Sequence, residues 1–284
     1  MTRLRKLRRT LAGWPAGLLV LVLLLWTLMP IYNMVAVSLE KGEDVFSANI
    51  WPANASLVSY ATVINQGHWY LTNFWIQMWN SLFIGIITAL MVLAIGSVTS
   101  FAIMRLRVRA GWLLSNAALL TYVIPMSFLA IPFYKIMNSY GLTDNAWSVI
   151  LVEVTFATPY AIFIFQQYST SIPHELDEAA KIDGANAPGI FFYIFLPLTA
   201  PALVAVGTYA LLLAWNEYLY AFLMLASPRK VTVPVALGYF LSSDEAPWNL
   251  LMAAAIIYSI PPLIVYYMFR RYMSAGLTIG GVKG

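Results

Sequence analysis

Long apolar runs alternate along this chain with shorter segments that hold nearly all of its charge. A run of about 20 apolar residues forms a helix that can cross the roughly 30 Å hydrocarbon core of a bilayer. Six such runs are present, and we expect each to be a transmembrane helix: Trp14–Ser38, Trp79–Met104, Trp112–Met137, Ala146–Tyr168, Leu198–Ala226 and Leu250–Phe269. The predicted fold is an all-α integral membrane protein with six transmembrane helices.

Composition supports this prediction and excludes several kinds of site. The chain is 61% hydrophobic and 10% charged, whereas soluble domains carry about 25% charged residues. The lack of cysteine excludes disulfides, thiol catalysis and Cys-ligated zinc or iron–sulfur centres. His68 and His174 are far apart in sequence, so we expect no histidine-rich metal site.

The positions of the basic residues predict the orientation in the membrane. With the N-terminus in the cytoplasm, the opposite side of the membrane holds four Lys and Arg residues, Lys41, Lys135, Arg229 and Lys230. The remaining twelve, Arg105 among them, fall on the cytoplasmic side. Because cytoplasmic loops carry the excess of Lys and Arg, we expect both termini to be cytoplasmic. The net charge of +4 therefore reflects the basic residues that orient the chain in the membrane. We expect no nucleic-acid partner.

The chain divides into three predicted regions. Residues 1–78 hold a basic segment, the first transmembrane helix and an outer loop. The first apolar run exceeds the roughly 7–15 residues of a signal-peptide core, so we expect it to be retained. Residues 79–272 form a core with five transmembrane helices, and residues 273–284 form a glycine-rich cytoplasmic tail.

A cytoplasmic segment between the fourth and fifth spans, residues 171–197, has the pattern of a helix–turn–helix. Pro173 suits the first turn of a helix, and the acids that follow it suit the positive end of the helix dipole. Gly184 suits a left-handed stop, after which Asn186 and Pro188 can begin a second helix, Gly189–Leu196.

The first of these two helices predicts a contact with a soluble partner. Leu176, Ala179, Ala180 and Asp183 share one face at helical spacing. Two alanines anchor poorly in lipid, but they allow the backbone to come close to a protein groove. We therefore interpret the segment as a docking element. The alternative is a solvated loop, which would explain the charge but not the paired alanines or the positions of glycine and proline.

The same segment resembles the EAA loop of ABC importer permeases. The matching residues are Glu178-Ala179-Ala180, Asp183-Gly184-Ala185, Phe191, Ile194, Leu196-Pro197 and Pro201. In that family the loop is the coupling helix that inserts into a cleft of the ATPase subunit. The resemblance implies that ATPase coupling in this chain is carried by seven residues: Glu178, Ala179, Ala180, Asp183, Gly184, Leu196 and Pro197.

Two further regions resemble the smaller permease of the maltose-type carbohydrate importers. The tail Ala275–Gly284 is similar to theirs, which implies that Gly280, Gly281 and Lys283 lie at the ATPase interface. Trp215-Asn216-Glu217 looks like their Trp-Asn-acidic element. The implied partners are a second homologous permease, two ATPase subunits, an extracytoplasmic solute-binding protein and membrane lipid. The implied location is the bacterial inner membrane.

ATP chemistry is expected on a partner subunit and not on this chain. No GxxxxGK[ST] loop occurs in the sequence, and such a loop is what cradles phosphates in P-loop ATPases. We therefore expect no cofactor here, with ATP and magnesium bound to the separate ATPase. A membrane enzyme would also need a catalytic constellation, such as paired histidines or a nucleophile elbow, which the sequence lacks.

Two carboxylates lie within predicted spans, and buried acids in membranes are functional candidates. Trp215, Asn216, Glu217 and Tyr218 together offer hydrogen-bonding groups and aromatic faces that could contact a sugar. The alternative is that Glu217 and Asn216 only hold neighbouring helices together. A second hypothesis for the whole chain is an ion-coupled secondary transporter that uses Glu217 or Glu153.

Overall fold

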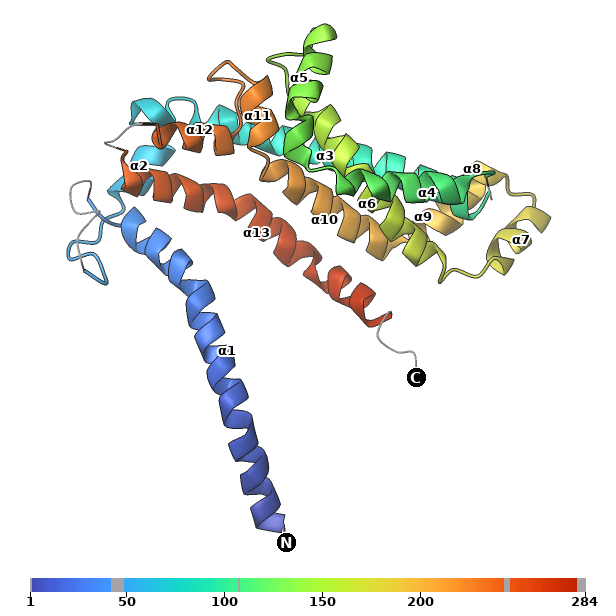
Figure 1. Ribbon diagram of the computed structural model, residues 1–284, viewed down its shortest axis with the longest axis horizontal. Coiled ribbons are helices and arrows are strands. Elements are labelled where there is room, and N and C mark those ends of the chain that lie inside the picture. Colours follow the sequence, from blue (N-terminus) through green and yellow to red (C-terminus); the bar gives the residue numbers. More distant parts are fainter. Residues whose placement is uncertain (1, 42–48, 107, 243–245, 280–284) are drawn as a thin grey trace. The chain divides into compact units, whose positions relative to one another are not determined.

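The computed structural model describes residues 2–41, 49–106, 108–242 and 246–279, with the backbone alone in 2–15 and 271–279 (Figure 1). All regular elements in these ranges are helices. Four of them are long: α1 (Thr2–Ser38), α3 (Phe74–Met104), α6 (Ala146–Ser169) and α13 (Trp248–Ile279).

Shorter helices connect the long ones. They are α2 (Val58–Ile64), η2 (Trp69–Leu71), α4 (Gly111–Leu120), η3 (Thr121–Val123), η4 (Met126–Leu129), α5 (Ala130–Ser139), α7 (Glu175–Ile182), α8 (Ala187–Ile190), η5 (Phe191–Phe195, a π-helix), α9 (Leu196–Leu198), α10 (Ala200–Trp215), α11 (Leu219–Met224) and α12 (Val233–Phe240).

The four long helices each contain a stretch that is long and apolar enough to cross a membrane. Two further stretches, Gly111–Ser139 and Ala187–Trp215, qualify only as helix pairs that are bent at a short break. If each bent pair counts as one span, the described part of the chain has six. The predicted all-α membrane fold is confirmed.

The third span, predicted as Trp112–Met137, is present but interrupted in its middle. The helix ends at Val123, and the next one starts at Met126 with a bend of 93° between them. Pro125 lies in the break with an extended ψ of 129°. Proline has no N–H to donate and disfavours helical geometry in the residue before it, which favours the interruption of the helical hydrogen bonds at this point.

The fifth span, predicted as Leu198–Ala226, is also interrupted. It bends by 78° between Leu198 and Ala200, where Pro197 and Pro201 flank the break and remove two backbone donors. The straight part, α10, ends at Trp215, and Asn216–Tyr218 are not helical. The straight membrane-spanning part is therefore shorter than predicted.

The other spans have nearly the predicted extent. The fourth, Ala146–Tyr168, is confirmed as α6 to within one residue. The second starts earlier than predicted, at Phe74, and the sixth continues past Phe269 to Ile279. The helical residues 273–279 thus include the first part of the segment that we predicted to be a tail.

The chain forms two compact units. The first consists of residues 1–72 and 239–258, and the second of residues 73–238 and 259–284. In the first unit, Asn249 donates a hydrogen bond to Ser59 Oγ at 3.0 Å. Tyr70 and Phe240 stack there with their ring centroids 4.5 Å apart.

The core of the second unit is built by α3, α6 and α10, which pack on one another. Small residues allow these helices to come close. A Cβ placed on Gly96 of α3 would lie only 2.8 Å from Ala161 Cβ of α6. On α10, Ala202 and Ala210 are fully buried. Close approach lets backbone and side chains pack tightly where lipid provides no hydrophobic driving force between helices.

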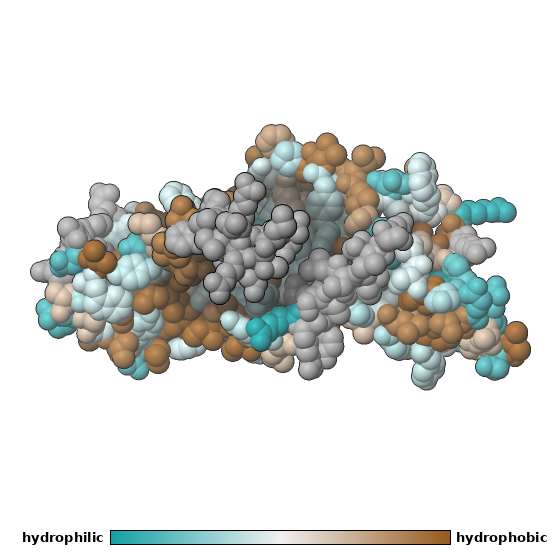
Figure 2. Space-filling view, turned by 90° about the horizontal axis from the view of Figure 1, so that it is seen from below, coloured by the Kyte–Doolittle hydropathy of each residue, from teal (hydrophilic) through white to brown (hydrophobic). Residues whose placement is uncertain are grey.

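Many large apolar side chains are exposed, among them Leu18, Trp26 and Met29 of α1. Figure 2 shows hydrophobic residues over much of one face of the molecule. In water such a surface would cause aggregation, whereas in a bilayer it faces acyl chains. The distribution agrees with a membrane protein.

Candidate functional site

Residues 171–197 fold into the predicted helix–turn–helix. α7 has Glu175, Asp177 and Glu178 in its first turn and Lys181 in its last, and both placements are favourable for the helix dipole. His174 occupies the N-cap position. We predicted Pro173 in the first turn of this helix. The helix begins at Glu175, so Pro173 lies just before that turn.

Gly184 ends α7 in the left-handed conformation, with φ at +86°. Its N–H donates to the carbonyl of Lys181 at 3.1 Å, and the N–H of Ala185 donates to the carbonyl of Ala180 at 2.8 Å. These two bonds form a Schellman motif, which satisfies carbonyls that a helix end leaves free. The predicted left-handed stop at Gly184 is confirmed.

The second half of the helix–turn–helix starts two residues earlier than predicted, at Ala187. Asn186 is its N-cap, and its Oδ1 accepts a hydrogen bond from the Gly189 N–H at 2.9 Å. Pro188 is tolerated because the first turn needs no N–H partner there. Further along, the rings of Phe191 and Phe195 each lie 5.3 Å from the ring of Phe101 at the end of α3.

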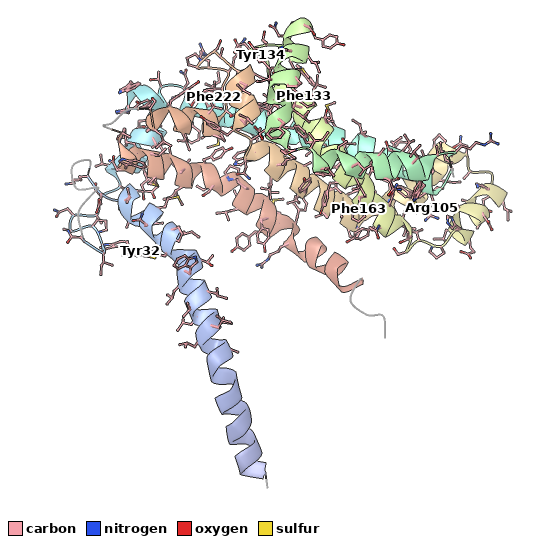
Figure 3. All side chains as sticks on the ribbon, viewed as in Figure 1. Tyr32, Arg105, Phe133, Tyr134, Phe163 and Phe222 are labelled. Atoms are coloured by element: carbon pink, nitrogen blue, oxygen red, sulfur yellow. The ribbon has the colours of Figure 1, made fainter. Side chains whose placement is uncertain are left out.

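The first half is joined to the helical bundle by one buried guanidinium, that of Arg105 (Figure 3). Arg105 Nη1 lies 3.2 Å from Asp177 Oδ2 and 3.0 Å from His174 Nδ1. Arg105 Nη2 donates to the carbonyls of Ser169, at 3.4 Å, and Ile172, at 3.0 Å. The end of α3 thus holds both the end of α6 and the start of α7.

The residues that we predicted to contact an ATPase are mostly open to a partner. Four are exposed: Glu178, Ala179, Asp183 and Gly184. Ala180 is half-buried and packs against the aromatic cluster around Phe101, as does Leu196. Pro197 is exposed at the bend before α10. The neighbouring Ile182 is 87% exposed, so the same face also offers a large apolar side chain.

The four predicted solute-path residues lie at the break between α10 and α11. Trp215 is only 2% exposed and packs near Gly85 of α3. Asn216 is exposed, although its Nδ2 donates back to the carbonyl of Leu212 at 2.8 Å. Glu217 Oε1 accepts the N–H of Tyr220 at 2.6 Å, and Tyr218 is 43% exposed. Asn216 and Tyr218 therefore present side chains outward, whereas Trp215 packs inward.

Glu153, the other intramembrane acid, lies in the same region. It is 1% exposed, and its Oε1 has no hydrogen-bond partner in the part of the chain that the structure describes. One turn further along α6, the ring of Phe156 lies 5.4 Å from that of Tyr220, which bonds to Glu217. The Tyr220 hydroxyl donates to the carbonyl of Met126, beside the break in the third span. Polar groups from three interrupted or buried segments thus come together here.

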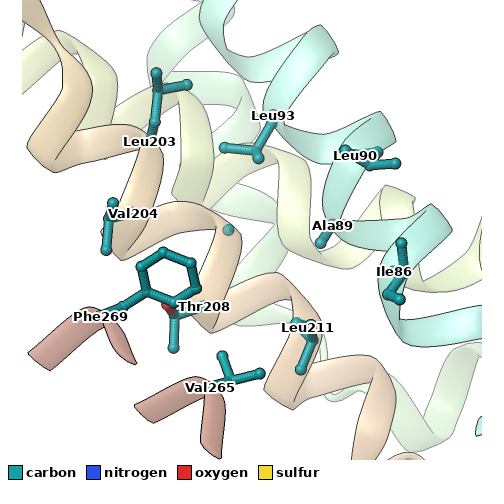
Figure 4. Close-up of a pocket in the computed structure, with 11 residues that line it drawn as sticks. Ile86, Ala89, Leu90, Leu93, Leu203, Val204, Thr208, Leu211, Val265 and Phe269 are labelled. Atoms are coloured by element: carbon teal, nitrogen blue, oxygen red, sulfur yellow. The ribbon is translucent and has the colours of Figure 1, made fainter. Parts of the chain in front are cut away.

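A groove of about 300 Å³ lies between α3, α10 and α13 (Figure 4). Its lining is almost entirely apolar and includes Leu93 of α3, Leu211 of α10 and Phe269 of α13, with Thr208 as a polar contributor. A sugar needs several hydrogen-bonding groups, so this groove has the wrong chemistry for a carbohydrate site.

The loop that joins α11 to α12, residues 225–232, is held by the N-terminal half of α3. Gln77 Nε2 donates to the carbonyl of Pro228 at 2.9 Å. Asn80 Nδ2 donates to the carbonyls of Arg229 and Val231 at 2.9 and 3.1 Å. Where the loop ends, Ser81 Oγ accepts the N–H of Val233 at 3.0 Å.

The same loop is also held by Asp144, between α5 and α6. Asp144 Oδ1 accepts the N–H groups of Ala226 and Ser227, both at 3.0 Å. Its Oδ2 accepts the Ser227 hydroxyl at 2.6 Å and the Lys230 ammonium at 3.0 Å. The hydrogen bonds from Ser227 hold the pKa of Asp144 well below its usual range. The loop is therefore fixed from two sides.

Two further predictions concern the tail and metal sites. Gly280, Gly281 and Lys283 lie outside the described residues. Among the residues that the structure does describe, no group of three or more His, Cys, Asp or Glu side chains could hold a metal ion.

The Arg105 contacts and the Asp144 contacts were missed by sequence reasoning. We counted Arg105 as a topology signal and placed Asp177 among acids that favour a helix start. A weak signal was available, because Arg105 is the first charged residue after the second span and lies at its very end. Nothing in the sequence connects Asp144 to Ser227, 83 residues away.

Comparison with known proteins identifies a family. The sequence profile described as "Binding-protein-dependent transport system inner membrane component" matches residues 93–279. The chain is 30% identical to "Inner membrane ABC transporter permease protein YcjP" of Escherichia coli (strain K12), over 98% of this chain and 99% of that protein.

Other relatives carry more specific names. The chain is 33% identical to "Trehalose transport system permease protein SugB" of Mycobacterium tuberculosis, over 91% of this chain and 93% of the relative. Among solved structures, a bacterial ABC transporter involved in the import of the acidic polysaccharide alginate contains a chain of the same fold. The TM-score is 0.77 at 23% identity, covering 93% of this chain and 96% of that one.

Proposed function

This chain belongs to the family of binding-protein-dependent transport system inner membrane components, and on that premise we propose that it imports a carbohydrate as one permease subunit of an ATP-driven transporter. Like its relatives, it is a multi-pass permease of the inner membrane and not an enzyme. ATP and magnesium would bind to a separate ATPase subunit.

The proposed solute class rests on relatives. The names of three related permeases refer to trehalose, to arabinooligosaccharides and to trehalose or maltose transport. A sugar, glycoside or polyol is therefore the solute that we propose. Asn216, Glu217 and Tyr218 are the residues that we assign to its path, because they lie at a break in a membrane-spanning helix where hydrogen-bonding groups are not all used by the helix itself.

The observation that carries the proposed mechanism is the capped and exposed helix α7. Its start is fixed by Arg105 and its end by the Schellman motif, so Glu178, Ala179 and Asp183 are held in a defined arrangement on an exposed face. Such a preorganised helix suits docking into a protein groove. Closure of two ATPase subunits around ATP would then displace α7 and switch the bundle by rigid-body rotation.

The proposed assembly contains a second homologous permease, two ATPase subunits and an extracytoplasmic solute-binding protein. Both termini would lie in the cytoplasm, as the distribution of Lys and Arg predicts. Gly280, Gly281 and Lys283 of the tail would then be able to reach the ATPase interface.

Charge reversal at Glu178 tests the coupling role. The complex would be isolated through a tag on this chain, and membrane level, ATPase co-purification and solute uptake would be measured. We expect Glu178→Lys to leave the membrane level unchanged and to abolish both co-purification and uptake. Arg109→Glu, a reversal at an exposed residue outside the helix–turn–helix, serves as the control.

Two results would contradict the proposal. Normal uptake and normal ATPase recovery with Glu178→Lys would show that α7 is not the coupling element. Uptake by this chain reconstituted without any ATPase would instead favour the ion-coupled transporter, and Glu153 and Glu217 would then be the residues to examine.

A further inference from the structure

The C-terminal end of α3 contacts both halves of the helix–turn–helix. Phe101 and Arg105 are four residues apart and therefore lie on one face of this helix end. Phe101 packs on Phe191 and Phe195 of the second half. Arg105 pairs with Asp177 of the first half. A displacement of either half is thus opposed by direct contacts with α3.

The N-terminal end of the same helix holds the α11–α12 loop. Gln77 and Asn80 bind three backbone carbonyls of that loop, and Ser81 binds the N–H of the residue after it. At a rise of about 1.5 Å per residue, Gln77 and Arg105 are separated by roughly 42 Å along the helix. α3 therefore connects two loops at opposite ends of a membrane span, as its course in Figure 1 shows.

α3 is also suited to transmit a displacement over this length. It is continuous from Phe74 to Met104 and has no proline. The other three long helices do contain proline: Pro15 and Pro30 in α1, Pro159 in α6, and Pro261 and Pro262 in α13. Each proline removes a helical hydrogen bond and introduces a point of bending. In addition, α3 packs on both α6 and α10.

We propose that α3 is the strut that links the movement of α7 to the α11–α12 loop, and that Arg105 is the positioning residue that fastens α7 to it. The inference rests on the proposed ATPase coupling and adds the route by which coupling crosses the membrane. The competing route is α6, which precedes α7 in the chain. Arg105 bonds to the end of α6 only through main-chain carbonyls, whereas its ion pair is with α7.

A spin label on the α11–α12 loop tests the link. The chain has no cysteine, so Arg229→Cys, at an exposed position, provides a single labelling site. In the purified complex with its ATPase, a non-hydrolysable ATP analogue should change the spectrum of this label. The same change is expected with Arg109→Gln, which removes an exposed guanidinium four residues from Arg105.

The decisive variants break the ion pair. Arg105→Gln leaves Asp177 buried without its partner and could reduce the amount of folded protein. The double variant Arg105→Gln/Asp177→Asn removes both charges. It should restore the amount of folded protein, and with it the recovery of the ATPase. We expect it to abolish the change in the label and to lower uptake per ATP hydrolysed by about tenfold, within the usual range of coupling between sites. Arg105→Lys, which keeps the charge but has a single donor nitrogen, should give an intermediate loss.

The possible failures are distinguishable. If the nucleotide-induced change persists in the double variant, or is absent from the wild-type complex with its ATPase bound, the strut is excluded. If uptake falls only as far as the protein level falls, and uptake per ATP hydrolysed is unchanged, Arg105 has a structural role and no role in coupling. If no ATPase is recovered with the wild-type chain, the proposed function itself fails.

Discussion

Gly238 of α12 lies directly against the ring of Tyr218. A Cβ placed on Gly238 would lie 2.8 Å from Cε2 and 3.0 Å from the hydroxyl oxygen of Tyr218. The same ring is nearly parallel to that of Phe222, at 9° with 5.6 Å between the centroids. Gly238 therefore provides the space in which Tyr218 takes this orientation.

Gly238→Ala should turn the Tyr218 ring away and weaken its stacking on Phe222, an interaction of about 0.5–1.5 kcal/mol for an aromatic pair. If Tyr218 contacts the solute, the KM for uptake should rise roughly two- to tenfold with ATPase binding unchanged. Uptake assays over a range of solute concentrations measure this, and Gly17→Ala, at a site with no neighbouring atoms within 4 Å, is the control. An unchanged KM would remove Tyr218 from the solute path.

Gly184→Ala should weaken coupling through the backbone alone. The left-handed conformation strains a residue with a Cβ by roughly 1–2 kcal/mol, although within this chain the Cβ would meet no atom within 4 Å. Gly184→Asn should be milder, because asparagine tolerates this conformation. We expect uptake and ATPase recovery to be highest with Gly184, lower with asparagine and lowest with alanine.

Gly141→Ala is the matched control for Gly184. Gly141 also has a positive φ, +68°, and open space around it, but it lies between α5 and α6. The alanine there should lower stability by a comparable amount and leave the ATPase bound. Equal loss of ATPase recovery in both variants would mean that Gly184 acts only through stability.

The Asp144 contacts predict a pH-dependent loop. Because the pKa of Asp144 is lower in the folded chain than its ordinary value of 3.8, the ionised carboxylate stabilises the fold. This contribution is complete above about pH 5 and is lost as the pH falls through the lowered pKa. The protection factors for hydrogen exchange at the Ala226 and Ser227 amides, which correct for the intrinsic pH dependence of exchange, should therefore be high at neutral pH and lower below pH 3.8.

Substitution of Asp144 separates the charge from the hydrogen bonds. Asp144→Asn keeps an oxygen acceptor for the two amides and tolerates the positive φ of 55°, so it should lose mainly the exposed pair with Lys230, about 0.2–1 kcal/mol. Asp144→Ala loses every contact of the side chain and adds strain. Equal exchange rates in both variants would contradict this account.

Glu217→Gln should change transport without disturbing the break after α10. Glutamine can still accept the Tyr220 N–H through its Oε1, so the local structure should persist while the charge is removed. We expect an altered KM with normal ATPase recovery. Glu217→Ala removes the acceptor as well and should also lower the amount of folded protein. Unchanged transport by Glu217→Gln would favour a purely structural role.

The spans and the helix–turn–helix could be predicted because apolar length and end signals are local in sequence. The Gly184 stop needs only a glycine after a short helix, and its hydrogen bonds come from residues within five positions. The same holds for the Asn186 cap. Such features depend on residues that are close in sequence and need no tertiary contact.

Which prolines break a span could not be predicted, because the same residue has different effects in different surroundings. Pro125 lies in a 93° break, whereas α6 continues through Pro159. The break at Asn216–Tyr218 contains neither proline nor glycine. The bond from the Tyr220 N–H to Glu217 Oε1 is local, but a glutamate at this position is no signal that a helix ends. The sequence of α7, which has only eight residues, also does not reveal which side of the helix faces the bundle. It therefore did not show which of its acids pairs with Arg105.

The Arg105 contacts also have a consequence for biosynthesis. The His174 partner is translated 69 residues after Arg105, which is a delay of about 3–14 seconds at 5–20 residues per second. Two more membrane segments must be inserted during this time. Arg105 lies at a helix end, so water can solvate its charge until α7 emerges. Arg105 is thus already at the membrane when its partners in α7 leave the ribosome.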